Sequence, residues 1–184
     1  PVRTLHRQSA RRGRDAPLGM SAFARLRPTL AVALAVIALD QGSKIALSRW
    51  LPEGERLVLA PFLQLVSVYN TGAAFSFLAQ AGGWQRGLFL ALAFGVSAWL
   101  SWLAASPGAE RMERFAYGLI VGGALGNAID RLAHGAVYDF LLFHAGRWAW
   151  PAFNLADSAI TVGVALLLWH YRRPHDTPRP ASQE

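Results

Sequence analysis

The chain has 184 residues, of which 53% are hydrophobic and only 16% are charged. Because soluble domains average about 25% charged residues, this composition argues against a soluble enzyme and against disorder of the main body. The formal net charge is +7, but seven arginines precede Pro28. The basic character is therefore mostly terminal and predicts no nucleic-acid-binding face. The absence of cysteine excludes disulfides and thiolate catalysis.

Four apolar stretches are long enough to cross a membrane, for which roughly 20 residues are needed. They cover residues 29–48, 84–105, 115–132 and 153–171. The sequence thus predicts an α-helical integral membrane protein with four transmembrane helices.

The arginines predict the orientation of these helices. They are concentrated in residues 1–27, in the connection 106–114 and after residue 171. The positive-inside rule then places both termini in the cytoplasm and the connections 49–83 and 133–152 outside. We expect three segments: an arginine-rich, disordered arm (1–27), a membrane domain (28–173) with an outer insert at about 49–83, and a cytoplasmic tail (174–184).

Two local patterns indicate how the helices and the insert are built. Residues 57–69 are rich in β-branched and aromatic side chains, which favours one or two short strands over a hydrophobic loop resting on lipid. Gly118, Gly122 and Gly126 recur every four residues, a spacing that lets helix backbones approach closely. We expect them to pack within the bundle, with a dimer face as the alternative.

Ionisable side chains inside spanning helices are costly, at about 2.5–3.5 kcal/mol each, and usually face a bundle interior or a cavity. With the predicted orientation, the unusual polar side chains of this chain all fall near the outer surface. They are Asp40, Lys44, Asn70, Asn127, Asp130, Arg131, Asp139, Asn154 and Asp157. Asp40 and Lys44 are four residues apart and are expected to form a local ion pair. Asp130 and Arg131 are expected to be structural, with Arg131 able to hold a carboxylate or reach a lipid headgroup.

Asp139 and Asp157 have no cationic neighbour in the sequence and both lie at the expected boundary between water and lipid. Two carboxyls brought together at low dielectric share one proton, so that one acts as an acid and the other as a base. Such a pair can activate water against an amide carbonyl. The five histidines show no metal-ligand spacing, so no metal or other cofactor is expected.

Three other functions use the same acids. A small proton-coupled carrier would need them as a proton pathway, although the inner halves of the helices lack polar groups. A metal-dependent lipid-headgroup transferase would use aspartates as Mg²⁺ ligands. A non-catalytic membrane scaffold would use them only for stability.

Five blocks in register resemble the lipoprotein signal peptidase (signal peptidase II) family. They are residues 40–44 (DQGSK), 69–75 (YNTGAAF), 122–131 (GGALGNAIDR), 137–140 (VYDF) and 151–159 (PAFNLADSA). The resemblance covers roughly residues 28–173. Tyr138 stands where a small aliphatic residue is expected, a difference that concerns substrate contacts rather than the acid pair.

The resemblance implies an aspartic endopeptidase of the bacterial inner membrane with a small periplasmic β-cradle. Its substrate is a diacylglyceryl-modified prolipoprotein, cut just before the lipidated cysteine at the periplasmic face. The catalytic pair maps to Asp139 and Asp157. The binding or supporting residues map to Asp40, Lys44, Asn70, Gly72, Asn127, Asp130, Arg131 and Asn154. The other implied partners are membrane lipid and the inhibitor globomycin; we expect a monomer that binds no nucleic acid.

Overall fold

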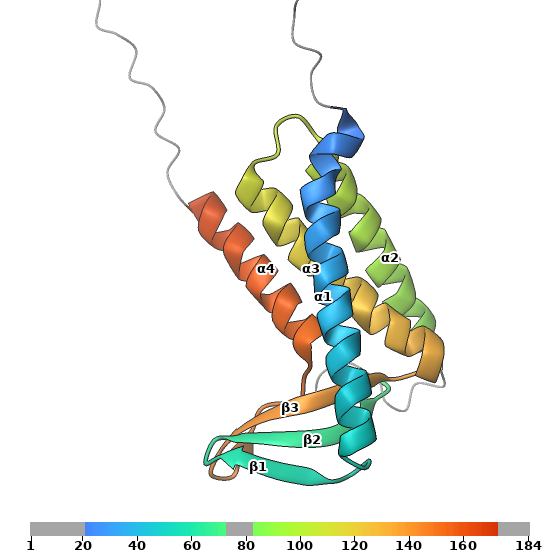
Figure 1. Cartoon of the computed structure of the whole chain (residues 1–184), viewed down its shortest axis with the longest axis vertical. Coiled ribbons are helices and arrows are strands. Elements are labelled where there is room, and N and C mark those ends of the chain that lie inside the picture. Colours follow the sequence, from blue (N-terminus) through green and yellow to red (C-terminus); the bar gives the residue numbers. More distant parts are fainter. Residues whose placement is uncertain (1–20, 73–82, 173–184) are drawn as a thin grey trace, which may run out of the picture.

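The computed structural model describes residues 21–72 and 83–172 as a helical bundle with a small sheet at one end (Figure 1). The four helices are α1 (Ala22–Trp50), α2 (Trp84–Ala105), α3 (Arg111–His134) and α4 (Leu155–Arg172). By length and hydropathy, α1 and α2 are candidate membrane spans within the described residues. The expectation of four helices is confirmed, and two of the four are long and apolar enough to cross a membrane.

Helix α1 begins earlier than the sequence predicts. It starts at Ala22 rather than residue 29, with Pro28 inside the helix. The Ser21 hydroxyl caps this end by accepting a hydrogen bond from the Ala24 N–H (3.2 Å). The Arg25 side chain donates to the Ala105 carbonyl at the end of α2 (2.7 Å). Residues 22–27 of the expected disordered arm are therefore helical, and that part of the prediction is wrong.

The expectations for the rest of the N-terminal arm and for the C-terminal tail concern residues that the structure does not describe. Residues 1–20 and 173–184 lie outside the described residues, as do residues 73–75 of one sequence block.

Helix α3 lies at the centre of the bundle and packs against each of the other three helices. It carries more buried residues than any other helix. The buried apolar cluster joins α3 to α1 and α2 and consists of Ala33, Leu100, Ala104, Tyr117, Ile120 and Val121. The position of every helix is thus set by its contact with α3.

The glycine stripe of α3 makes this close packing possible. A methyl group at Gly122 would lie 2.8 Å from the Ala33 carbonyl oxygen of α1, and one at Gly118 would lie 2.8 Å from the Thr29 carbonyl oxygen. Neighbouring Gly123 faces the Ala156 carbonyl of α4 in the same way. The predicted packing within the bundle is confirmed.

The sheet is antiparallel, with strand order β1-β2-β3-β4. The strands are β1 (Arg56–Ala60), β2 (Leu63–Asn70), β3 (Val137–Ala145) and β4 (Trp148–Ala149). Strands β1 and β2 confirm the prediction for residues 57–69, whereas β3 and β4 were not predicted. The Leu141 N–H donates to the Phe153 carbonyl (2.9 Å), and this bond ties β3 to the start of α4.

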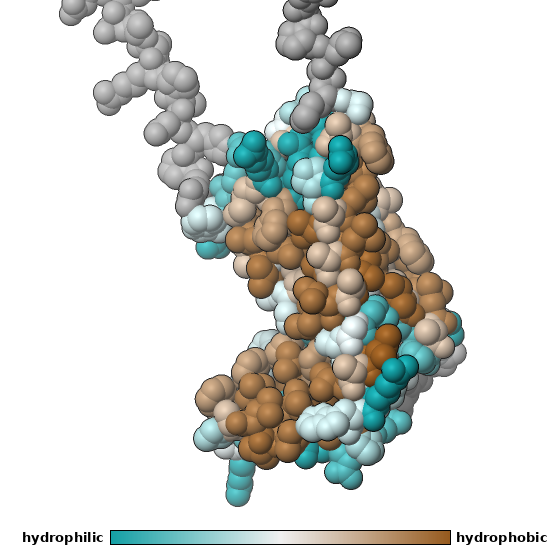
Figure 2. Space-filling view, viewed as in Figure 1, coloured by the Kyte–Doolittle hydropathy of each residue, from teal (hydrophilic) through white to brown (hydrophobic). Residues whose placement is uncertain are grey.

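On the face shown in Figure 2, apolar side chains cover the middle of the helices and much of the sheet, and hydrophilic side chains gather at the end of the bundle away from the sheet. Large side chains on α1 and α2 are strongly exposed; Leu34 is 66% and Trp102 is 70% accessible. Soluble monomers rarely expose contiguous apolar surface on this scale, whereas lipid-facing helices do. The surface therefore agrees with a membrane protein.

Candidate active site

A cavity of about 300 Å³ lies where the sheet meets the bundle. Six of the ten predicted site residues line it, namely Asn70, Gly72, Asn127, Arg131, Asp139 and Asp157. Asn154 contacts the cavity residues by hydrogen bonds, while Asp40, Lys44 and Asp130 are buried behind them. The predicted residues thus form one connected group.

Asp157 lies in the first turn of α4 and takes part in a reciprocal cap with Asn154. The Asn154 N–H donates to Asp157 Oδ2 (3.3 Å), and the Asp157 N–H donates to Asn154 Oδ1 (3.0 Å). This pattern satisfies two backbone donors at the helix start. It also holds the Asp157 side chain at the positive end of the helix dipole.

Asp139 reaches the same cavity from β3 and is only 2% exposed. Its carboxylate accepts hydrogen bonds from Asn154 Nδ2 (2.7 Å) and Asn70 Nδ2 (3.1 Å). Burial raises the pKa of Asp139 to about 7, and the negative charge of Asp157 acts in the same direction. The two amide donors and Lys44 oppose this shift. Asp139 can therefore hold or release a proton near neutral pH.

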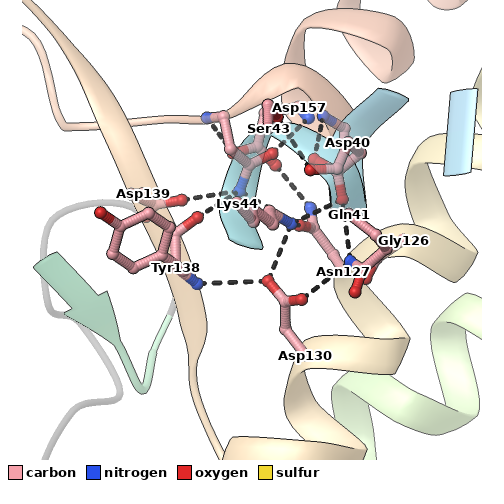
Figure 3. Close-up of polar contacts among 12 residues, drawn as sticks. Asp40, Gln41, Ser43, Lys44, Gly126, Asn127, Asp130, Tyr138, Asp139 and Asp157 are labelled. Atoms are coloured by element: carbon pink, nitrogen blue, oxygen red, sulfur yellow. Dashed lines mark hydrogen bonds and ion pairs between the residues drawn. The ribbon is translucent and has the colours of Figure 1, made fainter. Parts of the chain in front are cut away.

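Lys44 is buried beneath the cavity and is connected to Asp157 through Asn127 (Figure 3). Lys44 Nζ lies 2.7 Å from Asp40 and 2.8 Å from Asp130. The pair with Asp40 confirms the predicted i, i+4 contact; the pair with Asp130, from α3, was not predicted. Lys44 also donates to Asn127 Oδ1 (3.1 Å), and Asn127 Nδ2 donates to Asp157 Oδ1 (2.7 Å). Asn127 thereby connects the buried charges to the cavity.

Asp40 and Asp130, the two buried acids that contact Lys44, also bind the backbone of α4 and β3, the elements that contain Asp157 and Asp139. Asp40 Oδ1 accepts from the Ala156 N–H of α4 (3.0 Å), and Asp130 Oδ2 accepts from the Tyr138 N–H of β3 (3.2 Å). Each bond anchors a backbone N–H directly beside Asp157 or Asp139. Asp40 and Asp130 therefore have structural roles in the site.

Gln41 is a site residue that the sequence interpretation missed. Its side-chain amide contacts Asp40 Oδ2 (3.1 Å), Asp130 Oδ1 (2.9 Å) and the Gly126 carbonyl (3.2 Å). The available signal was a polar side chain inside an apolar helix, next to Asp40. The apolar cavity residues Trp150 and Phe153 were also missed, because a search for misplaced polar groups does not detect them.

Two residues differ from their expected contacts. Arg131 lines the cavity, but its Nη1 donates to the Asn127 carbonyl (3.3 Å) and its guanidinium lies 4.6 Å from the Phe89 ring centroid. Tyr138 is buried, and its hydroxyl donates to Ser67 Oγ (3.2 Å). Among the described residues it is not part of the cavity lining, because successive strand side chains point to opposite faces. The tyrosine at position 138 therefore changes a buried contact between β3 and β2 rather than the lining of the cavity.

The described residues contain no group of three or more His, Cys, Asp or Glu side chains placed to hold a metal ion. The donors around the cavity are instead two carboxyls and several amides, which suit proton transfer and the binding of a peptide backbone.

Comparisons with known proteins point to one family. Residues 32–173 match the protein family described as signal peptidase (SPase) II. A lipoprotein signal peptidase from Azoarcus sp. is 53% identical over 148 residues, covering 80% of this chain and 84% of that protein. Another, from Paraburkholderia phymatum, is 53% identical over 152 residues and covers 83% and 92%, respectively.

Two solved structures of a bacterial membrane enzyme share the fold. They have TM-scores of 0.70 and 0.69 with 27% and 28% identity. Each covers 81% of this chain, and the matches cover 93% and 94% of the solved chains. The chain therefore belongs to the signal peptidase II family, membrane aspartic proteases that cleave signal peptides from prolipoproteins.

Proposed function

We propose that Asp139 and Asp157 are the catalytic pair and that they hydrolyse the bond just before the lipidated cysteine of a diacylglyceryl-modified prolipoprotein. One observation carries this assignment: both carboxyls line the same cavity and both are hydrogen-bonded to Asn154. The pKa of Asp139, raised to about 7 by burial, supports a pair that keeps one proton at neutral pH.

In the proposed reaction Asp139 begins with the proton and Asp157 acts as the base. Asp157 takes a proton from water, and the water oxygen forms a bond to the carbonyl carbon. Asp139 donates its proton to the carbonyl oxygen, which gives a neutral tetrahedral diol. When the C–N bond breaks, the amine takes the proton from Asp157 and the diol returns a proton to Asp139. No cofactor takes part, and both carboxyls return to their starting states.

The remaining polar groups hold the substrate or the pair. Arg131 and Asn127 line the cavity and are proposed to bind the substrate backbone or the glyceryl portion. Asn70 donates to Asp139, and its Oδ1 accepts from the Gly72 N–H (3.0 Å), so this turn is part of the cavity wall. Asn154 orients both acids.

The proposed placement has all four helices crossing the bacterial inner membrane, with the sheet and the site at the periplasmic face. The start of α1, the α2–α3 connection and the end of α4 lie at the opposite end of the bundle from the sheet (Figure 1). Arginines gather at that end, including Arg25, Arg111, Arg114 and Arg172. The positive-inside rule supports a cytoplasmic location for it and for both termini. Residues 28–173 would then form one membrane domain that acts as a monomer.

The test follows the processing of a diacylglyceryl-modified prolipoprotein by purified protein carrying Asp139→Asn or Asp157→Asn. Each substitution should lower kcat by about 10²-fold or more, because neither variant retains both an acid and a base. Glu53→Gln, an exposed acid beside the sheet, is the matched control and should retain activity. Full activity of either Asn variant would remove that residue from the pair.

The same preparation addresses the other expectations. Globomycin should block cleavage, whereas a chelator should not, since no metal takes part in the proposed reaction. Family membership gives no support to the carrier alternative. That alternative requires ion flux in liposomes that Asp157→Asn abolishes, and we expect none.

A further inference from the structure

A second and larger hollow adjoins the catalytic cavity. Its volume is about 540 Å³, within the range of about 300–1,000 Å³ typical of ligand pockets. We call it the aromatic groove; it is lined by Phe143, Trp148, Trp150, Phe153, Asp157, Ser158, Thr161 and Val162. One wall comes from the β3–β4 hairpin and its exit, and the other from the first turns of α4.

The aromatic wall is already assembled. Phe143 and Phe153 stack with ring centroids 5.6 Å apart, and Trp148 meets Trp150 edge to face at 5.9 Å. These rings contact one another and remain partly exposed; Trp148 is 64% accessible. The wall therefore presents apolar area without needing to rearrange.

Beyond Asp157, where the groove meets the catalytic cavity, the opposite wall contains two hydroxyl side chains whose protons are already used. Ser158 Oγ donates to the Asn154 carbonyl (3.0 Å), and Thr161 Oγ1 donates to the Asp157 carbonyl (2.8 Å). Both hydroxyl protons are thus used by backbone carbonyls at the start of α4, which leaves the groove with few free donors. Away from Asp157, an occupant with its own polar groups would lose their hydration and gain few partners.

The groove and the catalytic cavity share Trp150, Phe153 and Asp157. We propose that the aromatic groove binds an acyl chain of the diacylglyceryl group on the substrate cysteine. This proposal rests on the proposed function, because it takes the bond beside that cysteine to be the one cut at Asp139 and Asp157.

The position and chemistry of the groove favour an acyl chain over the apolar stretch of the signal peptide. The lipid is attached to the residue directly after the scissile bond, so it must leave the catalytic cavity beside the acid pair, where the groove begins at Asp157. A peptide segment would bring backbone N–H and C=O groups that need partners, whereas an alkyl chain needs none. Thr161 and Val162 also line the groove and are exposed on the surface of α4, so the tail of the chain can remain in lipid.

A kinetic test fills the groove in the full chain. Val162→Trp places a large ring in it, whereas Val164→Trp alters a similar valine of α4 that does not line it; the two valines are 51% and 42% exposed. For a peptide with an S-dipalmitoylglyceryl cysteine, Val162→Trp should raise KM by about tenfold, the equivalent of excluding two methylene groups. Val164→Trp should leave KM within about twofold of wild type. Equal KM values for the two variants would overturn the proposal.

Photocrosslinking gives a readout that does not depend on cleavage or on the stability of a variant. The same peptide, carrying a diazirine on one acyl chain, is irradiated with the unaltered protein in detergent and the labelled residues are mapped. Label should appear on Phe143, Trp148 or Val162. Label confined to other helices, or label in the groove from a diazirine placed instead in the signal peptide, would refute the assignment. A wild-type enzyme that binds through the groove but does not cut the peptide would refute the proposed function alone.

Discussion

Replacing Asp139 by asparagine should remove a pH dependence of stability that this carboxyl imposes on the protein. Burial raises the pKa of Asp139 from an ordinary value of 3.8 to about 7. The folded state therefore keeps the proton up to about pH 7, while the unfolded chain releases it near 3.8. Because the folded state binds more protons in this window, the free energy of unfolding falls as the pH rises from about 4 to 7.

The difference between 3.8 and about 7 corresponds to about 4 kcal/mol at about 1.4 kcal/mol per pH unit. The carboxyl is 2% exposed, so solvent screens little of this cost. Asp139→Asn is neutral at every pH, so this contribution to the pH dependence of stability should be absent from the variant. The variant should be less stable than or similar to wild type at pH 4 and more stable at pH 7.

Unfolding in detergent, followed by intrinsic tryptophan fluorescence between pH 4 and 8, measures this difference. Glu55→Gln is the matched control, an exposed acid in the same region outside the helices. Its stability difference from wild type should vary little with pH. If the difference between Asp139→Asn and wild type also proves independent of pH, the reasoning about the buried proton is refuted.

Two further predictions concern the scaffold, each measured as the unfolding midpoint in detergent. Gly122→Ala should destabilise the bundle by about 1–3 kcal/mol, because the new methyl group would collide with the α1 backbone. The control Gly95→Ala places its methyl group in open space and should be neutral or stabilising. Equal effects of the two substitutions would contradict the packing described for α3. Lys44→Met should cost about 3–5 kcal/mol by leaving the Asp40 and Asp130 carboxylates buried without their cation. Adding Asp40→Asn and Asp130→Asn to Lys44→Met should recover part of that loss, and no recovery would argue against an electrostatic cause.

The helices were predictable because each one is a long apolar run. The beginning of α1 was not, since its first residues precede the apolar run; Ser21 caps this end, and Arg25 contacts the end of α2, 80 residues away in the sequence. Strand β3 escaped prediction for a related reason. Its apolar residues resemble any short buried segment, and only pairing with β2 and with Phe153 makes it a strand.

The members of the candidate site were predictable because a charge inside an apolar helix is expensive and therefore conspicuous. The contacts among these residues were only partly predictable. The i, i+4 contact of Lys44 with Asp40 follows from helix geometry, but its contact with Asp130 depends on how α1 registers against α3. The glycines of α3 set that register by admitting the α1 backbone.

By itself, the chain's pattern of apolar runs, arginines and misplaced polar groups determined which residues are candidates for the proposed chemistry, because the cost of burying a polar group applies to each residue separately. Only the tertiary structure decided that Asn154 contacts both acids, that Asp139 is buried enough for its pKa to reach about 7, and that an aromatic groove opens beside Asp157. These properties depend on surfaces from β3, β4 and α4 meeting in space, and no local pattern encodes the distance between them.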